Sequence, residues 1–157
     1  MAMTAALMMS GSVAQAQDVN IGRNNITLTS DLMTPETLWA MGRIGAAQAS
    51  PDGKKIVYQV GYYSVKENKG HQVLRVMDAD GKNDRLLTTS AKSEGDAAWL
   101  DNNTLAFLTG GQLWTMNADG TNRKQLTHSD IDIEGFRFSP DRKRVVLIKS
   151  IPYYGTI

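Results

Sequence analysis

Clustered aspartates are the residues of this chain best suited to binding a metal ion. Asp78 and Asp80 lie two residues apart and precede Gly81, a spacing that also opens calcium-binding loops. Such a loop ends in a glutamate at its twelfth position, but residues 87–89 are Leu-Thr-Thr. We therefore interpret these aspartates as turn formers that bond to nearby backbone N–H groups, and we expect no metal site.

Hydroxyl and imidazole groups show no pattern for nucleophilic catalysis. The two histidines, His71 and His128, have no metal-ligand spacing around them. The serines considered as nucleophiles are Ser10, Ser12, Ser50, Ser64, Ser90, Ser93, Ser129, Ser139 and Ser150. None lies in the G-x-S-x-G sequence of a nucleophile elbow. We assign no catalytic, cofactor-binding or metal-binding residue to this chain, and we expect no cofactor.

Composition indicates a globular protein without a dominant charge. Of the 157 residues, 41% are hydrophobic and 21% charged, and 17 basic against 16 acidic residues give a formal net charge of +1. The charges form no long block of one sign, so we expect no nucleic-acid partner. No apolar run reaches the roughly 18 residues that span a bilayer. With zero cysteines, disulfides and thiolate metal sites are excluded.

The N-terminal residues differ from the rest in composition. Residues 1–16 carry no charge, are rich in Ala and Met, and end in Ala14-Gln15-Ala16, the small-residue pattern of a signal-peptide cleavage site. We predict a signal peptide cleaved before Gln17, a polar lead-in over residues 17–31, and a periplasmic or secreted product. The basic residue that usually precedes the apolar segment is missing, so an N-terminal tail is the alternative.

A short helix is expected after the lead-in. Thr34 suits the N-cap, and Pro35 suits the first helical position because its missing N–H is not needed there. The helix should end near Gly42. We expect Leu38 and Trp39 to pack against the strands that follow, with docking on a neighbouring domain as the alternative.

A repeat with a period of 39 residues organises the remaining sequence. Asp-Ala-Asp-Gly at residues 78–81 returns as Asn-Ala-Asp-Gly at residues 117–120. Three flanking pairs keep the same spacing: Asn83 and Asn122, Leu87 and Leu126, Thr88 and Thr127. A second motif, Ser-Pro-Asp-Gly at residues 50–53, returns as Ser-Pro-Asp-Arg at residues 139–142, with a degraded copy at residues 100–103. A period near 40 is typical of propeller blades.

Each repeat is predicted to form four strands separated by turns. The expected strands are residues 44–49, 56–60, 73–77 and 84–88 in the first unit, 97–100, 104–108, 113–116 and 124–127 in the second, and 136–138 and 145–148 in the third. Antiparallel pairing places the two motif turns at one end of the sheets. The second unit should turn at Gly110-Gly111 in a two-residue primed hairpin.

The first unit has a long connection where the second has its tight hairpin. Residues 61–70 are predicted to form a loop at the opposite end from the motif turns, and they include Tyr62 and Tyr63. A merely lengthened hairpin is the simpler interpretation, and contact with a partner or substrate is the alternative.

We therefore predict an all-β fold, an incomplete WD-repeat-like propeller of about two and a half four-stranded blades with a short N-terminal helix. The expected divisions are a signal peptide at 1–16, the lead-in and helix at 17–43, and a partial propeller at 44–157, with blades at 44–90, 91–130 and 131–157. Propellers usually close with four to eight blades, so these residues are expected to be part of a longer protein.

Several motifs together resemble a known family. They are Met-Thr-Pro-Glu-Thr-Leu-Trp at 33–39, Arg-Ile-Gly at 43–45, Ser-Pro-Asp-Gly-Lys-Lys-Ile-Val-Tyr at 50–58, Glu-Asn-Lys at 67–69 and the Asp-Ala-Asp-Gly turn. Over roughly residues 30–157 the chain resembles secreted bacterial serine peptidases of the prolyl oligopeptidase family, in the dipeptidyl and acylaminoacyl peptidase branch. The two turn motifs alone are shared with TolB-like propellers, so the helix joined to the first blade discriminates better.

The resemblance implies an N-terminal propeller that admits short peptides, followed by an α/β-hydrolase domain with a triad in the order Ser, Asp, His. That domain would lie beyond residue 157, so no catalytic residue is carried over and this segment should be inactive alone. The alternative is a TolB-like propeller that binds protein partners and catalyses nothing.

Overall fold

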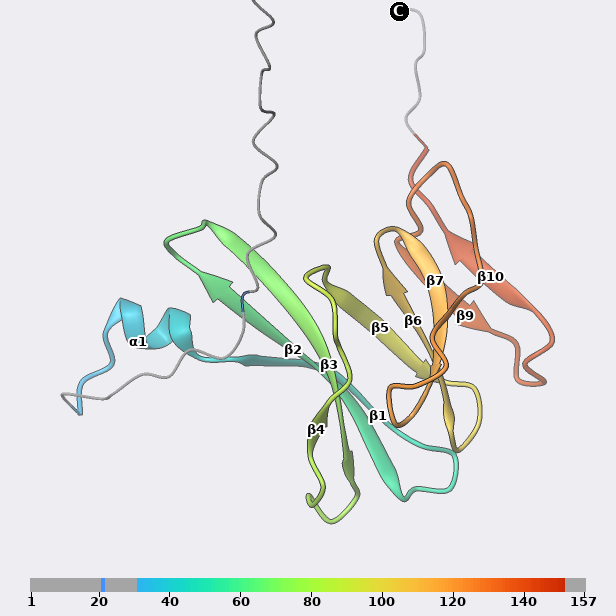
Figure 1. The fold of residues 1–157 in the computed structure, drawn as a ribbon, viewed down its shortest axis with the longest axis horizontal. Helices are drawn as coiled ribbons and strands as arrows, with labels where there is room; N and C mark the ends of the chain where they lie inside the picture. Colours follow the sequence, from blue (N-terminus) through green and yellow to red (C-terminus); the bar gives the residue numbers. More distant parts are fainter. Residues whose placement is uncertain (1–20, 22–30, 152–157) are drawn as a thin grey trace, which may run out of the picture.

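The computed structural model describes residue 21 and residues 31–151, which form one short helix and ten strands (Figure 1). The predicted signal peptide and most of the lead-in lie outside the described residues. The elements are α1 (Pro35–Ala40), β1 (Arg43–Ala49), β2 (Lys55–Ser64), β3 (Lys69–Asp78), β4 (Arg85–Leu86), β5 (Glu94–Trp99), β6 (Thr104–Thr109), β7 (Gln112–Asn117), β8 (Lys124–Gln125), β9 (Gly135–Phe138) and β10 (Val145–Ile148).

The strands form three antiparallel sheets in chain order. The first sheet has the order β1-β2-β3-β4, the second β5-β6-β7-β8, and β9 pairs with β10 in a two-stranded third. The predicted all-β class and the two four-stranded units are therefore confirmed. The outer strands β4 and β8 are only two residues long each, although the N–H groups of Leu87 and Leu126 just after them still donate to the carbonyls of Leu74 and Leu113 at 2.8 Å.

The helix begins as the sequence predicts. The Oγ1 atom of Thr34 accepts a hydrogen bond from the N–H of Thr37 at 3.2 Å, and Pro35 occupies the first turn. The helix ends at Ala40, followed by Met41 in an extended conformation, slightly before the expected end at Gly42.

The lengthened hairpin favoured for residues 61–70 is confirmed, whereas the open loop expected over this range was wrong. Strands β2 and β3 continue through most of it, with Tyr62 opposite His71, Tyr63 opposite Gly70 and Ser64 opposite Lys69. Only residues 65–68 are left as a turn. Aromatic side chains favour strands, and pairing satisfies the backbone groups that an open loop would leave to water. The first unit therefore carries a lengthened hairpin.

The inner strand of the second sheet also begins earlier than predicted, at Glu94 instead of Ala97. Its register with β6 shifts between Gly95 and Ala98, and Asp96 within that stretch has a φ of 50°. This is a β-bulge, which interrupts the alternation of side chains that strand prediction depends on.

The motif turns lie at one end of the sheets and the β2–β3 hairpin at the other, as predicted (Figure 1). Backbone hydrogen bonds join the two turns within each unit, from Ala79 N to Lys54 O at 2.8 Å and from Ala118 N to Asn103 O at 2.6 Å. The amide oxygen of Asn102 accepts from the N–H of Asp52 at 3.0 Å, which connects the first unit to the second.

The 39-residue repeat has a physical basis in the way each outer strand ends. Thr88 Oγ1 accepts from Leu74 N at 2.7 Å, and Thr127 Oγ1 accepts from Leu113 N at 2.9 Å. In both units a threonine hydroxyl thus satisfies an N–H of the third strand where the short outer strand no longer can.

Replacing Thr88 by Val is expected to lower the free energy of unfolding by about 1–3 kcal/mol, because it leaves the buried N–H of Leu74 without an acceptor while keeping the side-chain shape. Urea unfolding followed by tryptophan fluorescence measures the difference. Thr89→Val is the control at the exposed neighbouring position and should change stability by less than about 0.5 kcal/mol. Equal effects at the two positions would contradict this explanation of the repeat.

The core lies between neighbouring sheets. Val57, Leu74, Val76 and Leu87 of the first sheet and its margin pack against Trp99, Leu105, Phe107, Met116 and Ala118 of the second. A second cluster, formed by Ala106, Leu113, Ile133 and Phe136, joins the second sheet to the third. Packing of successive sheets face against face is what gives a repeat array a continuous core.

Candidate functional site

The helix and the β2–β3 hairpin form an aromatic contact. The rings of Trp39 and Tyr63 lie 4.9 Å apart, and the guanidinium carbon of Arg43 lies 4.7 Å from the Trp39 ring. Trp39 therefore packs against the strands as predicted, and both Trp39 and Leu38 remain partly exposed, at 41% and 48%. No residue of α1 is buried.

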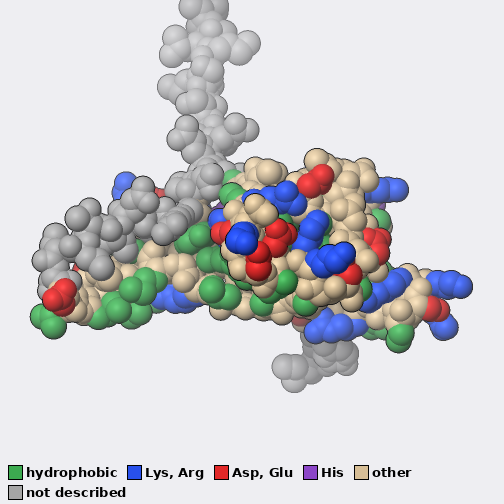
Figure 2. Space-filling view, turned by 90° about the horizontal axis from the view of Figure 1, so that it is seen from below, with side chains coloured by type: hydrophobic (Ala, Val, Ile, Leu, Met, Phe, Trp, Pro, Cys, Tyr) green, Lys and Arg blue, Asp and Glu red, His purple; other side chains and the backbone are tan. Residues whose placement is uncertain are grey.

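Several exposed hydrophobic residues lie in α1 and in the segments next to it. They are Leu32, Met33, Leu38, Trp39, Met41 and Ile44, each at least 41% exposed. In Figure 2 hydrophobic side chains gather at the left-hand end of the molecule, the end that carries α1 in Figure 1.

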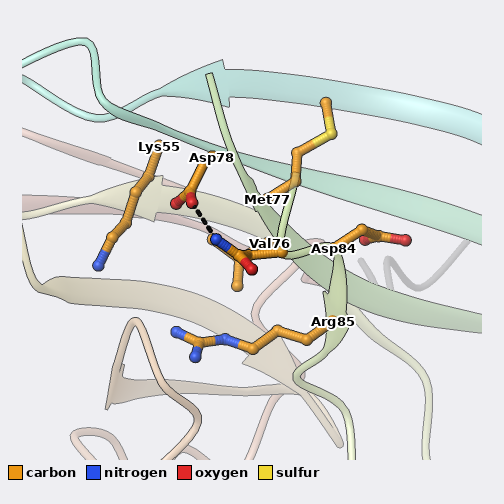
Figure 3. A pocket seen from close by; sticks show the side chains of 7 residues that line it. Lys55, Val76, Met77, Asp78, Asp84 and Arg85 are labelled. Carbon is orange, nitrogen blue, oxygen red and sulfur yellow. Dashed lines mark hydrogen bonds between the residues drawn. The ribbon is translucent and has the colours of Figure 1, made fainter. Parts of the chain in front are cut away.

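A depression of about 440 Å³ lies beside the Asp-Ala-Asp-Gly turn of the first sheet (Figure 3). Its polar lining consists of Lys55, Asp78, Asn83, Asp84 and Arg85. Asn83 Nδ2 donates to Asp78 Oδ2 at 2.6 Å, and Arg85 Nη2 donates to the carbonyl of Ala118 at 2.9 Å. These bonds hold the turn and connect it to the second sheet. We therefore interpret the polar groups of this depression as part of the folding of the turn and assign no ligand to them.

Asp84 belongs to a network at the margin of this depression. Tyr58 donates to Asp84 Oδ1 at 2.7 Å, and Arg75 donates through Nη2 to Oδ2 at 2.7 Å and through Nε to Oδ1 at 3.1 Å. The hydrogen bonds from Arg75 lower the pKa of the Asp84 carboxyl. Burial, and then the bond to Asp84, raises the pKa of the Tyr58 hydroxyl. The network joins β2 and β3 to the segment before β4.

Stability is expected to depend on pH through Asp84. Because the folded-state pKa of this carboxyl is depressed, its contribution is present above the ordinary carboxyl range near pH 4 and is lost as the pH falls below it. The Asp84→Asn variant should thus be less stable than the unmodified protein by at most about 1 kcal/mol at pH 7, given the exposure of the pair, and this difference should shrink progressively as the pH falls below about 4. Denaturant unfolding at several pH values measures it.

Asp130→Asn is the matched control, since the exposed Asp130 carboxylate has no hydrogen bond to the described residues. A pH dependence that is unchanged in Asp84→Asn, or changed equally in Asp130→Asn, would contradict the assignment.

The remaining turn aspartates follow one pattern. Each carboxylate accepts the backbone N–H two residues further on, at distances between 2.7 and 3.2 Å. They are Asp52, Asp80, Asp101, Asp119 and Asp141, and hydrogen bonds lower the pKa of each. This is the turn-forming geometry that the sequence predicts. Within residue 21 and residues 31–151, no group of three or more acidic or histidine side chains could hold a metal ion.

The two histidines have different surroundings. His71 is buried, with Nδ1 at 2.7 Å from the carbonyl oxygen of Ile21 and Nε2 at 3.3 Å from that of Lys92. It therefore connects the lead-in to the segment that precedes β5. His128 is exposed. Among the described residues no serine hydroxyl bonds to either ring, and the hydroxyls of Ser50 and Ser139 donate instead to the turn aspartates Asp52 and Asp141.

An ion pair with a fully buried carboxylate in the second unit was missed by sequence reasoning. Glu94 at the start of β5 is fully buried, and its Oε1 accepts from Nη2 of Arg123. The Arg123 guanidinium carbon lies 4.9 Å from the Phe107 ring, and its Nη1 is 3.4 Å from the carbonyl of Leu87 in the first unit. The other oxygen, Glu94 Oε2, has no hydrogen-bond partner among residue 21 and residues 31–151. The pair stabilises the contact between the two sheets.

Sequence comparison gives two relatives of similar identity. No family model matches the chain. It is 35% identical over 130 residues to Dipeptidyl-peptidase 5 of Porphyromonas endodontalis, and 36% identical over 132 residues to Dipeptidyl-peptidase 5 of Porphyromonas gingivalis. These alignments cover 80% and 81% of the chain. The chain belongs to the prolyl oligopeptidase family. It spans 19% of the length of each of these relatives.

Solved structures support the fold of this family segment. An acylaminoacyl peptidase of Pyrococcus horikoshii matches with a TM-score of 0.56 at 12% identity, over 71% of the chain and 18% of that protein. The AtxE2 isopeptidase matches with a TM-score of 0.56 at 18% identity, over 69% and 22%. An oligogalacturonate lyase in complex with manganese matches with 0.54 at 19% identity, over 70% and 35%. At these identities the matches show the propeller-like fold alone.

The described part of the chain contains no helix that is long and apolar enough to cross a membrane.

Proposed function

We propose that this segment is the N-terminal propeller portion of an exported serine exopeptidase of the dipeptidyl or acylaminoacyl type, which acts on short peptides. The observation that carries the proposal is the similarity to two dipeptidyl peptidases along four fifths of the segment. The catalytic α/β-hydrolase domain, with its Ser, Asp and His, would be provided by residues outside these 157.

In this proposal the sheets are propeller blades at residues 44–90, 91–130 and 131–157. The first strands β1, β5 and β9 would be the innermost strands, because each is the first strand at one edge of its sheet, and residues of all three line one depression. A closed ring of such blades would leave a narrow central passage and so restrict access to short peptides. Further blades would cover β10, in which Val146 is 66% and Ile148 53% exposed.

The activity test compares the product of the complete reading frame with residues 17–157 alone. We expect the complete product to release dipeptides or acylated residues from chromogenic peptides and to lose this activity after treatment with an organophosphonate that labels active serines. Residues 17–157 alone should show no turnover. A complete product without peptidase activity would contradict the proposal and favour a non-catalytic binding propeller, and turnover by residues 17–157 alone would contradict the absence of catalytic residues.

Export is proposed from residues 1–16, which lie outside the described residues. Mass spectrometry of protein purified from the periplasm or the medium should find a mature N-terminus at Gln17. Intact residues 1–16 on protein confined to the cytoplasm would contradict export.

A further inference from the structure

A second depression lies where the first strands of the three sheets converge. It has a volume of about 420 Å³ and is lined by residues from β1, β5 and β9 and from the two Ser-Pro-Asp turns. Trp99 forms a buried part of its wall, and its indole N–H donates to the carbonyl of Gln48 at 3.1 Å, which fixes the distance between β1 and β5. Phe136 and Phe138 provide a further aromatic wall, with their rings 5.7 Å apart.

The only charged side chains that line this depression are Arg137 and Arg142. Arg137 Nη1 donates to the carbonyl of Phe136 at 2.7 Å, which leaves its Nε and Nη2 groups without a partner among the described residues. The guanidinium of Arg142 has no partner there either. Through its Oδ1 atom, the nearby carboxylate of Asp141 accepts from the Ser139 hydroxyl and from the N–H of Lys143, and no bond joins it to either guanidinium among the described residues.

Lysine and arginine side chains are therefore in local excess at this end of the molecule. Residues 142–144 are Arg-Lys-Arg, next to Arg137 on the neighbouring strand. Figure 2 shows blue side chains gathered at the right-hand end, where β9 and β10 lie in Figure 1. Positive potential over an aromatic wall favours a ligand that combines an anionic group with an apolar portion.

Arg142 has a positive φ, which strains a residue that carries a side chain. The first Ser-Pro-Asp turn, at residues 50–53, has a glycine at the equivalent position. Arg142 has a φ of 59°, and the equivalent Gly53 of the first turn has a φ of 68°. Both turns close with a hydrogen bond of 2.9 Å from this N–H to the turn serine carbonyl. Glycine adopts this conformation readily, whereas other residues do so at an energetic cost of about 1 kcal/mol. An arginine that replaces glycine at a depression lined by a second arginine points to a role other than folding.

We propose that this depression binds a peptide carboxylate, held by Arg137 and Arg142, with an adjacent apolar side chain of the peptide against the half-buried Phe138. Guanidinium groups bind carboxylates through paired, charge-assisted hydrogen bonds, and the partly desolvated aromatic wall strengthens such bonds. The carboxylate can belong to an acidic side chain or to the C-terminus of the peptide. The choice of a peptide as the ligand rests on the proposed function, whereas a complete product that is an active peptidase but binds no carboxylate here would contradict this proposal alone.

Fluorescence anisotropy with labelled peptides tests the proposal on the product of the complete reading frame. One peptide carries Glu-Phe with a blocked C-terminus, a second carries Gln-Phe with a free C-terminal carboxylate, and a third carries Gln-Phe with a blocked C-terminus. We expect at least one of the first two to bind at least tenfold more tightly than the third, and to weaken as salt is raised. The peptide that binds identifies the source of the carboxylate.

Arg142→Gly is the decisive variant, because it introduces the glycine that the first Ser-Pro-Asp turn has at the equivalent position, Gly53. It should keep or raise the melting temperature while weakening carboxylate binding about tenfold, and Arg137→Gln should weaken binding similarly. Lys143→Gln removes the same charge from a residue that does not line the depression, and it should change binding less than threefold. Equal binding of all three peptides, or equal effects of Arg142→Gly and Lys143→Gln, would overturn the proposal.

Discussion

Replacing Arg123 by alanine is expected to lower the free energy of unfolding by about 3–5 kcal/mol, one of the two largest effects predicted for a single substitution in this chain. The reason is that Glu94 is fully buried, and Arg123 forms an ion pair with it. Without the guanidinium, a carboxylate remains between the sheets with no partner for either oxygen except the Ser90 hydroxyl at 3.4 Å. Guanidinium chloride unfolding, followed by tryptophan fluorescence, measures the loss.

A double substitution separates the burial of an unpaired charge from the loss of packing. Glu94→Leu combined with Arg123→Met removes both charges and keeps apolar volume over Phe107, so it should recover most of the stability lost in Arg123→Ala. If the double variant is as unstable as Arg123→Ala, the loss arises from packing, and the interpretation of the ion pair is wrong.

The second large effect is expected at Leu74. This side chain is fully buried in the cluster that joins the first two sheets, so Leu74→Ala should lower the free energy of unfolding by about 2–5 kcal/mol through lost burial and the cavity that remains. Leu86→Ala is the matched control, because Leu86 lies in the same sheet but is 52% exposed; it should lose less than about 1 kcal/mol. Similar losses at the two leucines would contradict the placement of the core.

Much of the fold follows from local signals in the sequence. The N-cap at Thr34 and the Gly110-Gly111 hairpin depend on residues close together in the chain, and the structure confirms both, with φ values of 56° and 69° at the two glycines. The repeat is predictable for the same reason. Each Asp-containing turn and each threonine that ends a unit acts within its own 39 residues.

Other features depend on contacts between distant residues and were not predictable. The β2–β3 hairpin extends because Tyr62 and Tyr63 find partners across the strands, although no turn motif marks the true turn at residues 65–68. Glu94 and Arg123 come together only after the bulge at Asp96 and the outer strand of the same sheet are in place. The depression between β1, β5 and β9 likewise requires three sheets. In the sequence, Arg142 is noticeable only because the first Ser-Pro-Asp motif has Gly53 at the equivalent position.

We propose that these residues are the non-catalytic propeller portion of a serine peptidase. Sequencing the messenger RNA or genomic DNA beyond codon 157 tests this proposal. We predict a continuous reading frame that encodes further repeats of about 40 residues and then a G-x-S-x-G sequence followed by Asp and His in that order. A frame that closes after the last blade without a G-x-S-x-G sequence would contradict the proposal.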